Sequence, residues 1–103
     1  ILQRIEKDLG EYARTITYLA QKTVRERLAE VLILLEGKLG TDKDGFINIS
    51  LTREEMANLI GTATESAIRL ISEFKTDGLI EGEGRKIKIL DRQKLTKLGH
   101  VIL

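Results

Sequence analysis

Two amphipathic segments that meet at a glycine constrain the fold of this chain more than any other feature of its sequence. They lie in the stretch LTREEMANLIGTATESAIRLISEFKTDGLI (51–80). Thr52 followed by Glu55 is a capping-box pattern, which predicts the start of a helix. Gly61 ends this helix, because glycine adopts left-handed backbone angles that are costly for other residues. A second helix follows almost at once, so the two helices must pack closely across a short turn.

Small residues occupy the positions where these two helices would touch. Ala57 lies on the first helix, and Ala67 lies on the inner side of the second. The second helix is expected over about 63–76 and can start at Thr62; by its spacing of three from Thr62, Glu65 is either the other half of a capping box or a residue of the outward face. This arrangement predicts a helix-turn-helix.

A β-hairpin is expected directly after the second helix. The turn is expected at Gly82-Glu83-Gly84, and Ile87 and Ile89 then alternate with lysines, which is typical of a strand. FINIS (46–50) predicts another short strand, and DRQKLTKLG (91–99) predicts a closing helix. The expected fold class is therefore mainly α with a small β-hairpin wing, a winged helix-turn-helix preceded by a long dimerisation helix.

The N-terminal segment has a different pattern from the rest of the chain. Its apolar residues are spaced alternately by three and four, at Leu2, Ile5, Leu9, Tyr12, Ile16 and Leu19. Such a narrow seam favours pairing with a second copy in a coiled coil, although an ordinary amphipathic helix would also fit. The chain starts inside this pattern without methionine, so we expect it to be a piece of a longer protein.

The seam stops near Ala20 to Lys22, where a hinge is expected. A wider apolar face then begins, and it predicts a helix that ends near Gly37 to Gly40. The residues of this face are Val24, Leu28, Val31, Leu32 and Leu35. The chain is thus expected to divide into a dimerisation helix with its hinge (1–22) and a winged helix-turn-helix domain (23–103).

The composition excludes several classes of site. Without cysteine the chain has no disulfide or thiolate metal site, and its single histidine, His100, is expected at the surface or in packing and not as a ligand. No phosphate-cradling glycine loop is present, so neither catalysis nor a metal site is expected. The turn GTDKDG (40–45) resembles part of a calcium loop, but Gly40 and Leu51 occupy two ligand positions, and a solvated turn is expected. No apolar run could cross a membrane, and cytoplasm is the expected compartment.

The net charge of +1 does not by itself indicate a nucleic-acid-binding protein. One local cluster, over residues 85–97, is basic, however, and contains a single acid, Asp91. Its basic residues are Arg85, Lys86, Lys88, Arg92, Lys94 and Lys97. Such a cluster is either an ordinary solvated face or a surface for phosphates, and its place beside the predicted hairpin favours phosphates.

The stretch LTREEMANLIGTATESAIRLISEFKTDGLIEGEGRKIKIL (51–90) resembles the DNA-binding domain of the Crp/Fnr transcription regulators. The resemblance covers about residues 23–92, and in that family a long dimerisation helix precedes this domain. It implies a homodimeric, sequence-specific regulator that inserts its recognition helix into the major groove of palindromic double-stranded DNA. It also implies a sensory domain outside this chain for an unknown effector, such as a cyclic nucleotide, with no cofactor in the chain itself. The turn 40–45 corresponds to a surface that contacts RNA polymerase in one branch.

The resemblance assigns base reading to the second helix. It implies that Arg69 reads guanine and that Glu65 reads cytosine, whose donors and acceptors match these side chains. By spacing alone, Glu65 could equally be a helix cap. Thr64 departs from the residue typical of the catabolite-activator branch, and Ile68 departs from that of the fumarate-nitrate branch. Different flanking bases are therefore expected, and Ile68 is expected to contact a thymine methyl group.

The resemblance also implies a set of phosphate contacts. Arg53 and Ser66 match such positions, Arg85 and Lys86 could add contacts from the wing, and Thr52 is mainly a helix cap. The alternative is a winged-helix and coiled-coil module for protein interaction without specific DNA binding. Apolar or acidic wing tips would be typical of such a module, whereas this hairpin is basic.

Overall fold

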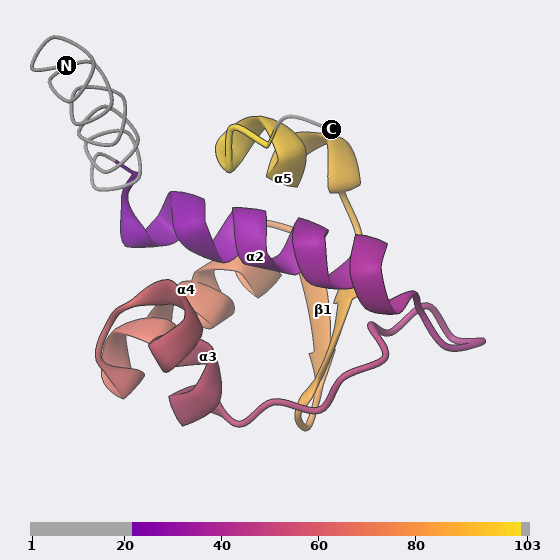
Figure 1. The fold of residues 1–103 in the computed structure, drawn as a ribbon, viewed down its shortest axis with the longest axis horizontal. Helices are drawn as coiled ribbons and strands as arrows, with labels where there is room; N and C mark the ends of the chain where they lie inside the picture. The colour runs from indigo at the N-terminus through magenta and orange to yellow at the C-terminus, as the bar shows by residue number, and fades with distance from the viewer. Residues whose placement is uncertain (1–21, 102–103) are drawn as a thin grey trace, which may run out of the picture.

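One helix, α2 (Val24–Leu39), crosses the middle of the structure, with α5 on one side and the other elements on the other (Figure 1). The computed structural model describes residues 22–101, so the predicted seam of Leu2, Ile5, Leu9, Tyr12, Ile16 and Leu19 lies outside the described residues. After α2 the elements are α3 (Arg53–Ile60), α4 (Thr64–Thr76), β1 (Ile80–Glu83), β2 (Lys86–Ile89) and α5 (Arg92–Leu98). The predicted mainly helical fold with a hairpin wing is confirmed.

The start of α2 is set by a capping box. The Thr23 hydroxyl accepts a hydrogen bond from the Glu26 amide at 3.1 Å, and the Glu26 carboxylate accepts one from the Thr23 amide at 3.3 Å. The helix ends at Gly40, which has a φ of 72°. Its buried residues, Leu28, Ala29, Leu32 and Ile33, face the core. The apolar pattern after the predicted hinge therefore forms one helix, as expected.

The helix-turn-helix forms as the glycine junction predicts. Thr52 and Glu55 cap α3 reciprocally, with hydrogen bonds of 3.1 Å and 3.0 Å. Gly61 follows α3 in the left-handed conformation, with φ 73° and ψ 45°. Ala57 and Ala67 are 1% and 0% exposed, so small residues do lie where α3 and α4 meet.

The predicted cap of α4 is wrong. Ala63, not Thr62, is the N-cap, and no side chain makes a capping hydrogen bond there. The amide of Thr62 bonds the carbonyl of Ala57 at 3.0 Å, so it closes the end of α3 and cannot also donate to the carboxylate of Glu65. Glu65 is therefore not part of a capping box.

The hairpin turn is also displaced from its predicted position. Glu83 pairs with Lys86, so the two-residue turn is Gly84–Arg85 rather than Gly82 to Gly84. Gly84 has a φ of 61°, which suits glycine at the first central position of such a turn. Gly82 lies within β1 opposite Ile87. Arg85 is consequently at the tip of the wing.

The predicted strand 46–50 is only partly present. Phe46 and Ile47 make isolated β-bridges with Lys88 and Thr41, and the Ile47 amide bonds the carbonyl of Ile87 at 2.9 Å. The chain then curls away, because the Ile49 amide bonds the carbonyl of Ile47. This segment therefore rests on the hairpin without extending it into a third strand.

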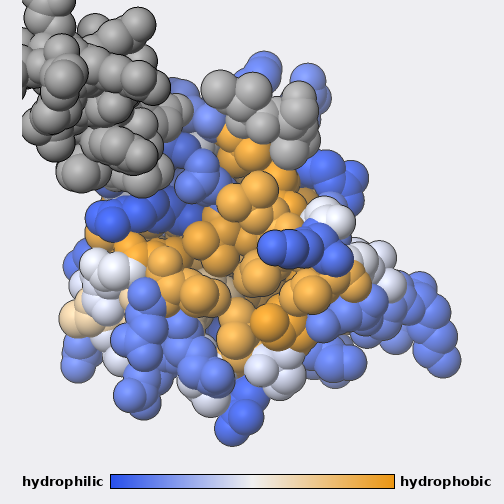
Figure 2. All heavy atoms as spheres, viewed as in Figure 1, coloured by the Kyte–Doolittle hydropathy of each residue, from blue (hydrophilic) through white to orange (hydrophobic). Residues whose placement is uncertain are grey.

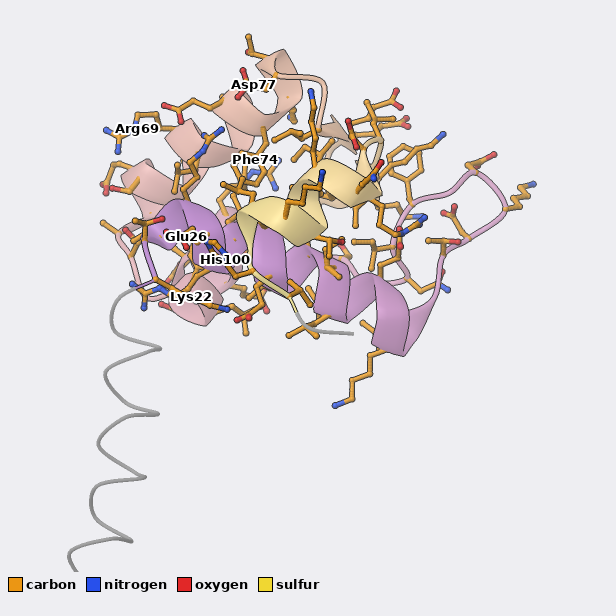
Figure 3. The ribbon with its side chains drawn as sticks, turned by 90° about the horizontal axis from the view of Figure 1, so that it is seen from above. Lys22, Glu26, Arg69, Phe74, Asp77 and His100 are labelled. Carbon is orange, nitrogen blue, oxygen red and sulfur yellow. The ribbon has the colours of Figure 1, made fainter. Side chains whose placement is uncertain are left out.

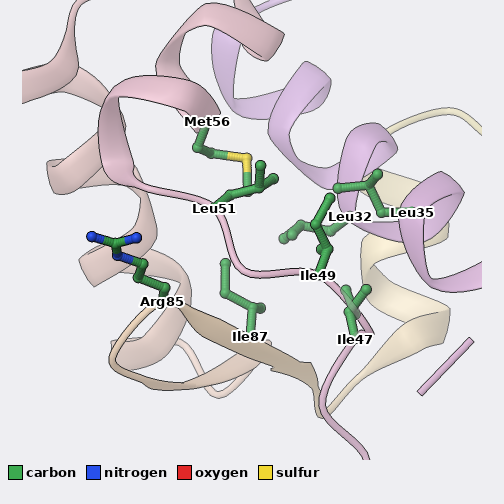
Figure 4. Close-up of a pocket in the computed structure, with 8 residues that line it drawn as sticks. All are labelled: Leu32, Leu35, Ile47, Ile49, Leu51, Met56, Arg85 and Ile87. Carbon is green, nitrogen blue, oxygen red and sulfur yellow. The ribbon is translucent and has the colours of Figure 1, made fainter. Parts of the chain in front are cut away.

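The core lies between α2, the helix-turn-helix, the hairpin and α5. Its largest fully buried side chains are Phe74, Leu28, Leu32, Ile47, Met56, Ile60, Ile71, Ile80 and Leu95. Figure 4 shows a small cavity beneath the hairpin, of about 10 Å³, with a mainly apolar lining. A space of this size scarcely admits one water molecule, so it is a packing gap and not a ligand site.

The face of the structure seen in Figure 2 carries an apolar patch. In the view of Figure 2, apolar side chains gather across the centre and charged side chains surround them. Leu34 and Leu39 on α2 are 51% and 41% exposed. The residues of this domain therefore do not cover α2 on all sides.

Gly61→Ala should destabilise the domain by about 1–2 kcal/mol, because a residue with a Cβ must then hold left-handed backbone angles. The added Cβ would also lie 3.2 Å from a guanidinium nitrogen of Arg27. Urea unfolding measures the change. Gly37→Ala is the matched control, since Gly37 is within α2 and its Cβ would meet no atom within 4 Å. The control should stabilise the domain by up to about 1 kcal/mol, and equal losses at both positions would contradict the assignment.

Glu55→Gln should flatten the loss of stability in acid. Hydrogen bonds from the Thr52 amide and hydroxyl hold the pKa of Glu55 below its ordinary value, and Arg85 lowers that pKa further. A carboxylate whose pKa is lowered by folding stabilises the fold above its unfolded pKa of about 4.3, and this stabilisation is lost as the pH falls through the folded pKa. Thermal unfolding from pH 7 to pH 3 measures the effect. Glu54→Gln, outside the capping box, should keep the wild-type acid slope, and an unchanged slope in Glu55→Gln would contradict the capping role.

Candidate nucleic-acid interface

The exposed face of α4 is defined by what the opposite face buries. Ala67, Leu70, Ile71 and Phe74 are buried against the rest of the domain. The intervening residues Glu65, Ile68 and Arg69 are exposed, and the side chain of Arg69 projects away from the body of the structure (Figure 3). Residues separated by three or four positions share one side of a helix. These three predicted base-reading residues therefore lie on one exposed face of α4.

Glu65 and Arg69 are not engaged by their own domain. Within residues 22–101, neither side chain takes part in a hydrogen bond or an ion pair. The competing interpretation of Glu65 as a helix cap fails because Ala63 is the N-cap of α4. The carboxylate and the guanidinium can thus meet an external partner without first breaking an internal contact.

The first turn of α4 brings two further predicted residues to the same end of the helix. Thr64 is the first residue of α4, and both Thr64 and Ser66 are half-buried. No side chain caps the amides of this turn. Unpaired amides at a helix start favour an anion.

The wing tip lies beside the start of α3. Arg53 donates a hydrogen bond to the carbonyl of Gly84 at 3.4 Å, and Arg85 is close enough to Glu55 to lower its pKa. Thr52 acts as the cap of α3, as predicted. The structure thus brings Arg53 and Arg85 together, although they are distant in the sequence.

Lys86 has a partner that the sequence did not suggest. Its ammonium lies 3.5 Å from Asp42, in the turn that follows α2. Desolvation raises the pKa of Asp42, but hydrogen bonds from the amides of Phe46 and Asp44, together with Lys86, outweigh it and leave that pKa below its ordinary value. The turn GTDKDG is therefore organised by Asp42. An exposed pair of this kind is weak, so Lys86 can exchange Asp42 for another anion.

The predicted basic cluster does not form one surface. Arg85 and Lys86 belong to the wing, whereas Arg92, Lys94 and Lys97 belong to α5. α5 packs on the side of α2 that faces away from α3 (Figure 1). The cluster is divided because the chain crosses α2 after β2.

Arg25 joins two helices through contacts that were not predicted from the sequence. Its guanidinium lies 3.3 Å from Glu73 and 3.2 Å from Asp77, and it stacks 5.0 Å from the centre of the Phe74 ring. These contacts tie α2 to the C-terminal half of α4. No local pattern could reveal them, since the partners are separated by 48 and 52 residues.

Other kinds of site find no support in the described part of the chain. Among residues 22–101, no three His, Cys, Asp or Glu side chains are grouped to hold a metal ion. Across the same residues, no helix combines the length and the apolar character needed to span a bilayer. His100 is largely exposed, as predicted.

Comparisons with known proteins point to one family. Residues 26–98 match the Crp-like helix-turn-helix domain. The transcriptional activator protein FnrA of Stutzerimonas stutzeri is 29% identical over 96% of this chain and 41% of its own length. A CRP-like cAMP-activated global transcriptional regulator of Mycobacterium tuberculosis is 32% identical over 69% of this chain and 33% of its own length. The chain thus spans less than half the length of these two relatives.

A solved structure supports the same conclusion. A CRP/FNR-family transcriptional regulator from Thermus thermophilus has a TM-score of 0.74 and 27% identity, over 98% of this chain and 53% of its own chain. These proteins are named as regulators, which agrees with the expectation from the sequence that the chain is not an enzyme. The match over residues 26–98 and the shared architecture show that the chain belongs to the Crp-like helix-turn-helix family.

Proposed function

We propose that this chain is the DNA-binding part of a dimeric, sequence-specific transcription regulator, which inserts α4 into the major groove of a palindromic site. The observation that carries the proposal is the exposed face of α4, where Glu65 and Arg69 have no partner within residues 22–101. The names of the relatives support a regulatory role. A helix presented in this way fits the width of the major groove.

The base-reading face has a defined chemistry. Arg69 offers paired donors to the O6 and N7 atoms of guanine, and Glu65 offers an acceptor to the N4 amino group of cytosine. Ile68 is 46% exposed beside them and has no polar group, so it suits a thymine methyl group. Thr64, the first residue of α4, would read a flanking base.

Phosphate contacts would come from two groups of residues. One group is Ser66 with the uncapped amides of α4. The other is Thr52 and Arg53 at the start of α3, with Arg85 and Lys86 of the wing. Phosphate contacts fix the position of a protein on the duplex and make its affinity depend on salt. The basic wing tip favours this function over a protein-interaction module.

The remaining parts of the proposal concern the whole protein. Residues 1–22 would form the dimerisation helix with its hinge, and residues 23–103 the DNA-binding domain. A sensory domain outside this chain would bind the effector, for which a cyclic nucleotide is one candidate because one relative is cAMP-activated. The turn 40–45 would contact RNA polymerase, and the protein would work in the cytoplasm.

Arg69→Ala should cost about 1–3 kcal/mol of binding free energy and relax specificity at one base pair, because the guanine loses its paired donors. A palindromic duplex is first selected from a random library, and fluorescence anisotropy then measures affinity for that duplex and for its single-base variants. Equal weakening on all sequences would show that Arg69 contacts only phosphate.

Two further arginine variants distinguish base reading from a phosphate contact and from no DNA contact. Arg85→Ala at the wing tip should weaken all sequences alike and reduce the slope of log affinity against log salt by about 1. Arg92→Ala removes the same side chain from α5, where it pairs with Glu36 at 2.5 Å, and should change neither the slope nor the specificity. If the wild-type chain shows no sequence preference and no salt dependence, the proposed function is wrong.

A charge in the predicted seam should convert the dimer to a monomer, because a charged residue at a coiled-coil core position is not solvated in the paired state. Sedimentation equilibrium of Ile5→Glu and of Ile16→Glu measures this change. Gln3→Glu adds the same charge outside the seam and should leave the wild-type mass. An unchanged mass in the two seam variants would refute the seam.

A further inference from the structure

Lys22 is the one charged residue that is buried among residues 22–101, with 6% of its surface exposed. Its ammonium forms an ion pair with Glu30 of α2 and donates a hydrogen bond to the carbonyl of Gly99 at 3.0 Å. The residue lies immediately before Thr23, the N-cap of α2. The described part of the domain therefore begins with a buried polar contact at Lys22.

The turn after α5 is shaped to receive this lysine. A Cβ on Gly99 would lie 2.8 Å from the backbone nitrogen of Glu30, so only glycine lets this turn lie directly on α2. His100 follows with a φ of 51°, and its ring nitrogen is 3.1 Å from the carboxylate of Glu26. Figure 3 shows Lys22, Glu26 and His100 at the same end of α2.

We propose that Lys22 is a positioning residue. By binding to the Gly99–His100 turn, it fixes the direction in which the preceding chain enters the DNA-binding domain. This inference rests on the function proposed above. Removing a buried ammonium leaves its carboxylate and carbonyl without a partner, so the contact resists bending at this point. The predicted hinge near Ala20 to Lys22 then cannot bend at Lys22.

The consequence for DNA binding is a fixed spacing between half-sites. In a dimer, the two recognition helices keep a constant separation only if each domain is held rigidly to the segment that joins the copies. One added base pair rotates one half-site against the other by about 34°. A rigid joint cannot follow this rotation, whereas a loose joint can.

The test uses the full chain and the palindromic duplex recovered by selection, with its spacer unchanged or altered by one base pair. The wild type should prefer the unchanged spacer by at least about tenfold. Lys22→Met removes the charge but keeps the length of the side chain, and Gly99→Ala keeps every charge but displaces the turn from Glu30. Both variants should reduce the preference to less than about threefold and keep the sequence preference within each half-site. Lys38→Met, at an exposed position of α2, is the matched control and should behave as wild type.

A second measurement separates this inference from the proposed function. Amide hydrogen exchange in Lys22→Met and Gly99→Ala should rise at least about tenfold for residues 26–27 and 99–101, with α3 and α4 unchanged. If Lys22→Met does not fold, the double variant Lys22→Met with Glu30→Met, which removes both charges of the ion pair, is used in its place. The inference would be overturned if the two variants kept the spacer preference of the wild type, or if their amide hydrogen exchange rose equally throughout the domain. A wild type that binds specifically without any spacer preference would also overturn it. Absence of specific DNA binding would refute the proposed function alone, and hydrogen exchange would still decide whether the joint exists.

Discussion

The close approach of α3 and α4 at their shared turn determines how the candidate interface is presented. Gly61 supplies the left-handed backbone angles that reverse the chain, and Ala57 and Ala67 are small enough for the helices to touch. Once Ala67 is fully buried, the helical period leaves Glu65 and Arg69 no position except the exposed side of α4. The orientation of the candidate reading face is thus a consequence of packing on its opposite side.

Charge is distributed along α4 in a way that suits a helix close to phosphates. Glu73 and Asp77, at its C-terminal end, are both paired with Arg25 of α2. Each exposed pair contributes little alone, but the stacking of Arg25 on Phe74 holds the guanidinium in place between them. Arg25 thereby offsets part of the negative charge at this end of α4 from within the domain. Glu65 remains as the acidic group available for a specific contact.

The wing and the chain end show how distant segments complete the domain. The tip of the hairpin contacts the start of α3 through Arg53 and Gly84, so the wing and the helix-turn-helix form one continuous edge. At the other end of the domain, the turn at Gly99 contacts the start of α2 through Lys22. The two contacts join the wing to the start of α3 and the turn after α5 to the start of α2.

Local patterns in the sequence predicted the elements well, since each depends on neighbouring residues. The capping box at Thr52 and Glu55 and the left-handed glycine at Gly61 require only contacts within a few positions, and both were correct. The errors arose where two local patterns competed for one backbone group. Thr62 resembles a helix cap, but its amide is already used to end α3. Likewise, the register of β1 and β2 places the turn at Gly84–Arg85, because that pairing buries both Ile80 and Ile87.

The helix-turn-helix and the wing follow from the sequence, because helical period and backbone preference are local properties. The choice of Glu65, Ile68 and Arg69 as base-reading candidates came from the resemblance to the Crp/Fnr regulators. Which charges are available and which are engaged depends on the tertiary packing. The pairing of Arg25 with Glu73 and Asp77 joins residues about 50 positions apart. The division of the basic cluster between wing and α5, and the burial of Lys22, likewise depend on how the chain crosses α2. Long-range electrostatic partners follow from packing, and no local spacing encodes them.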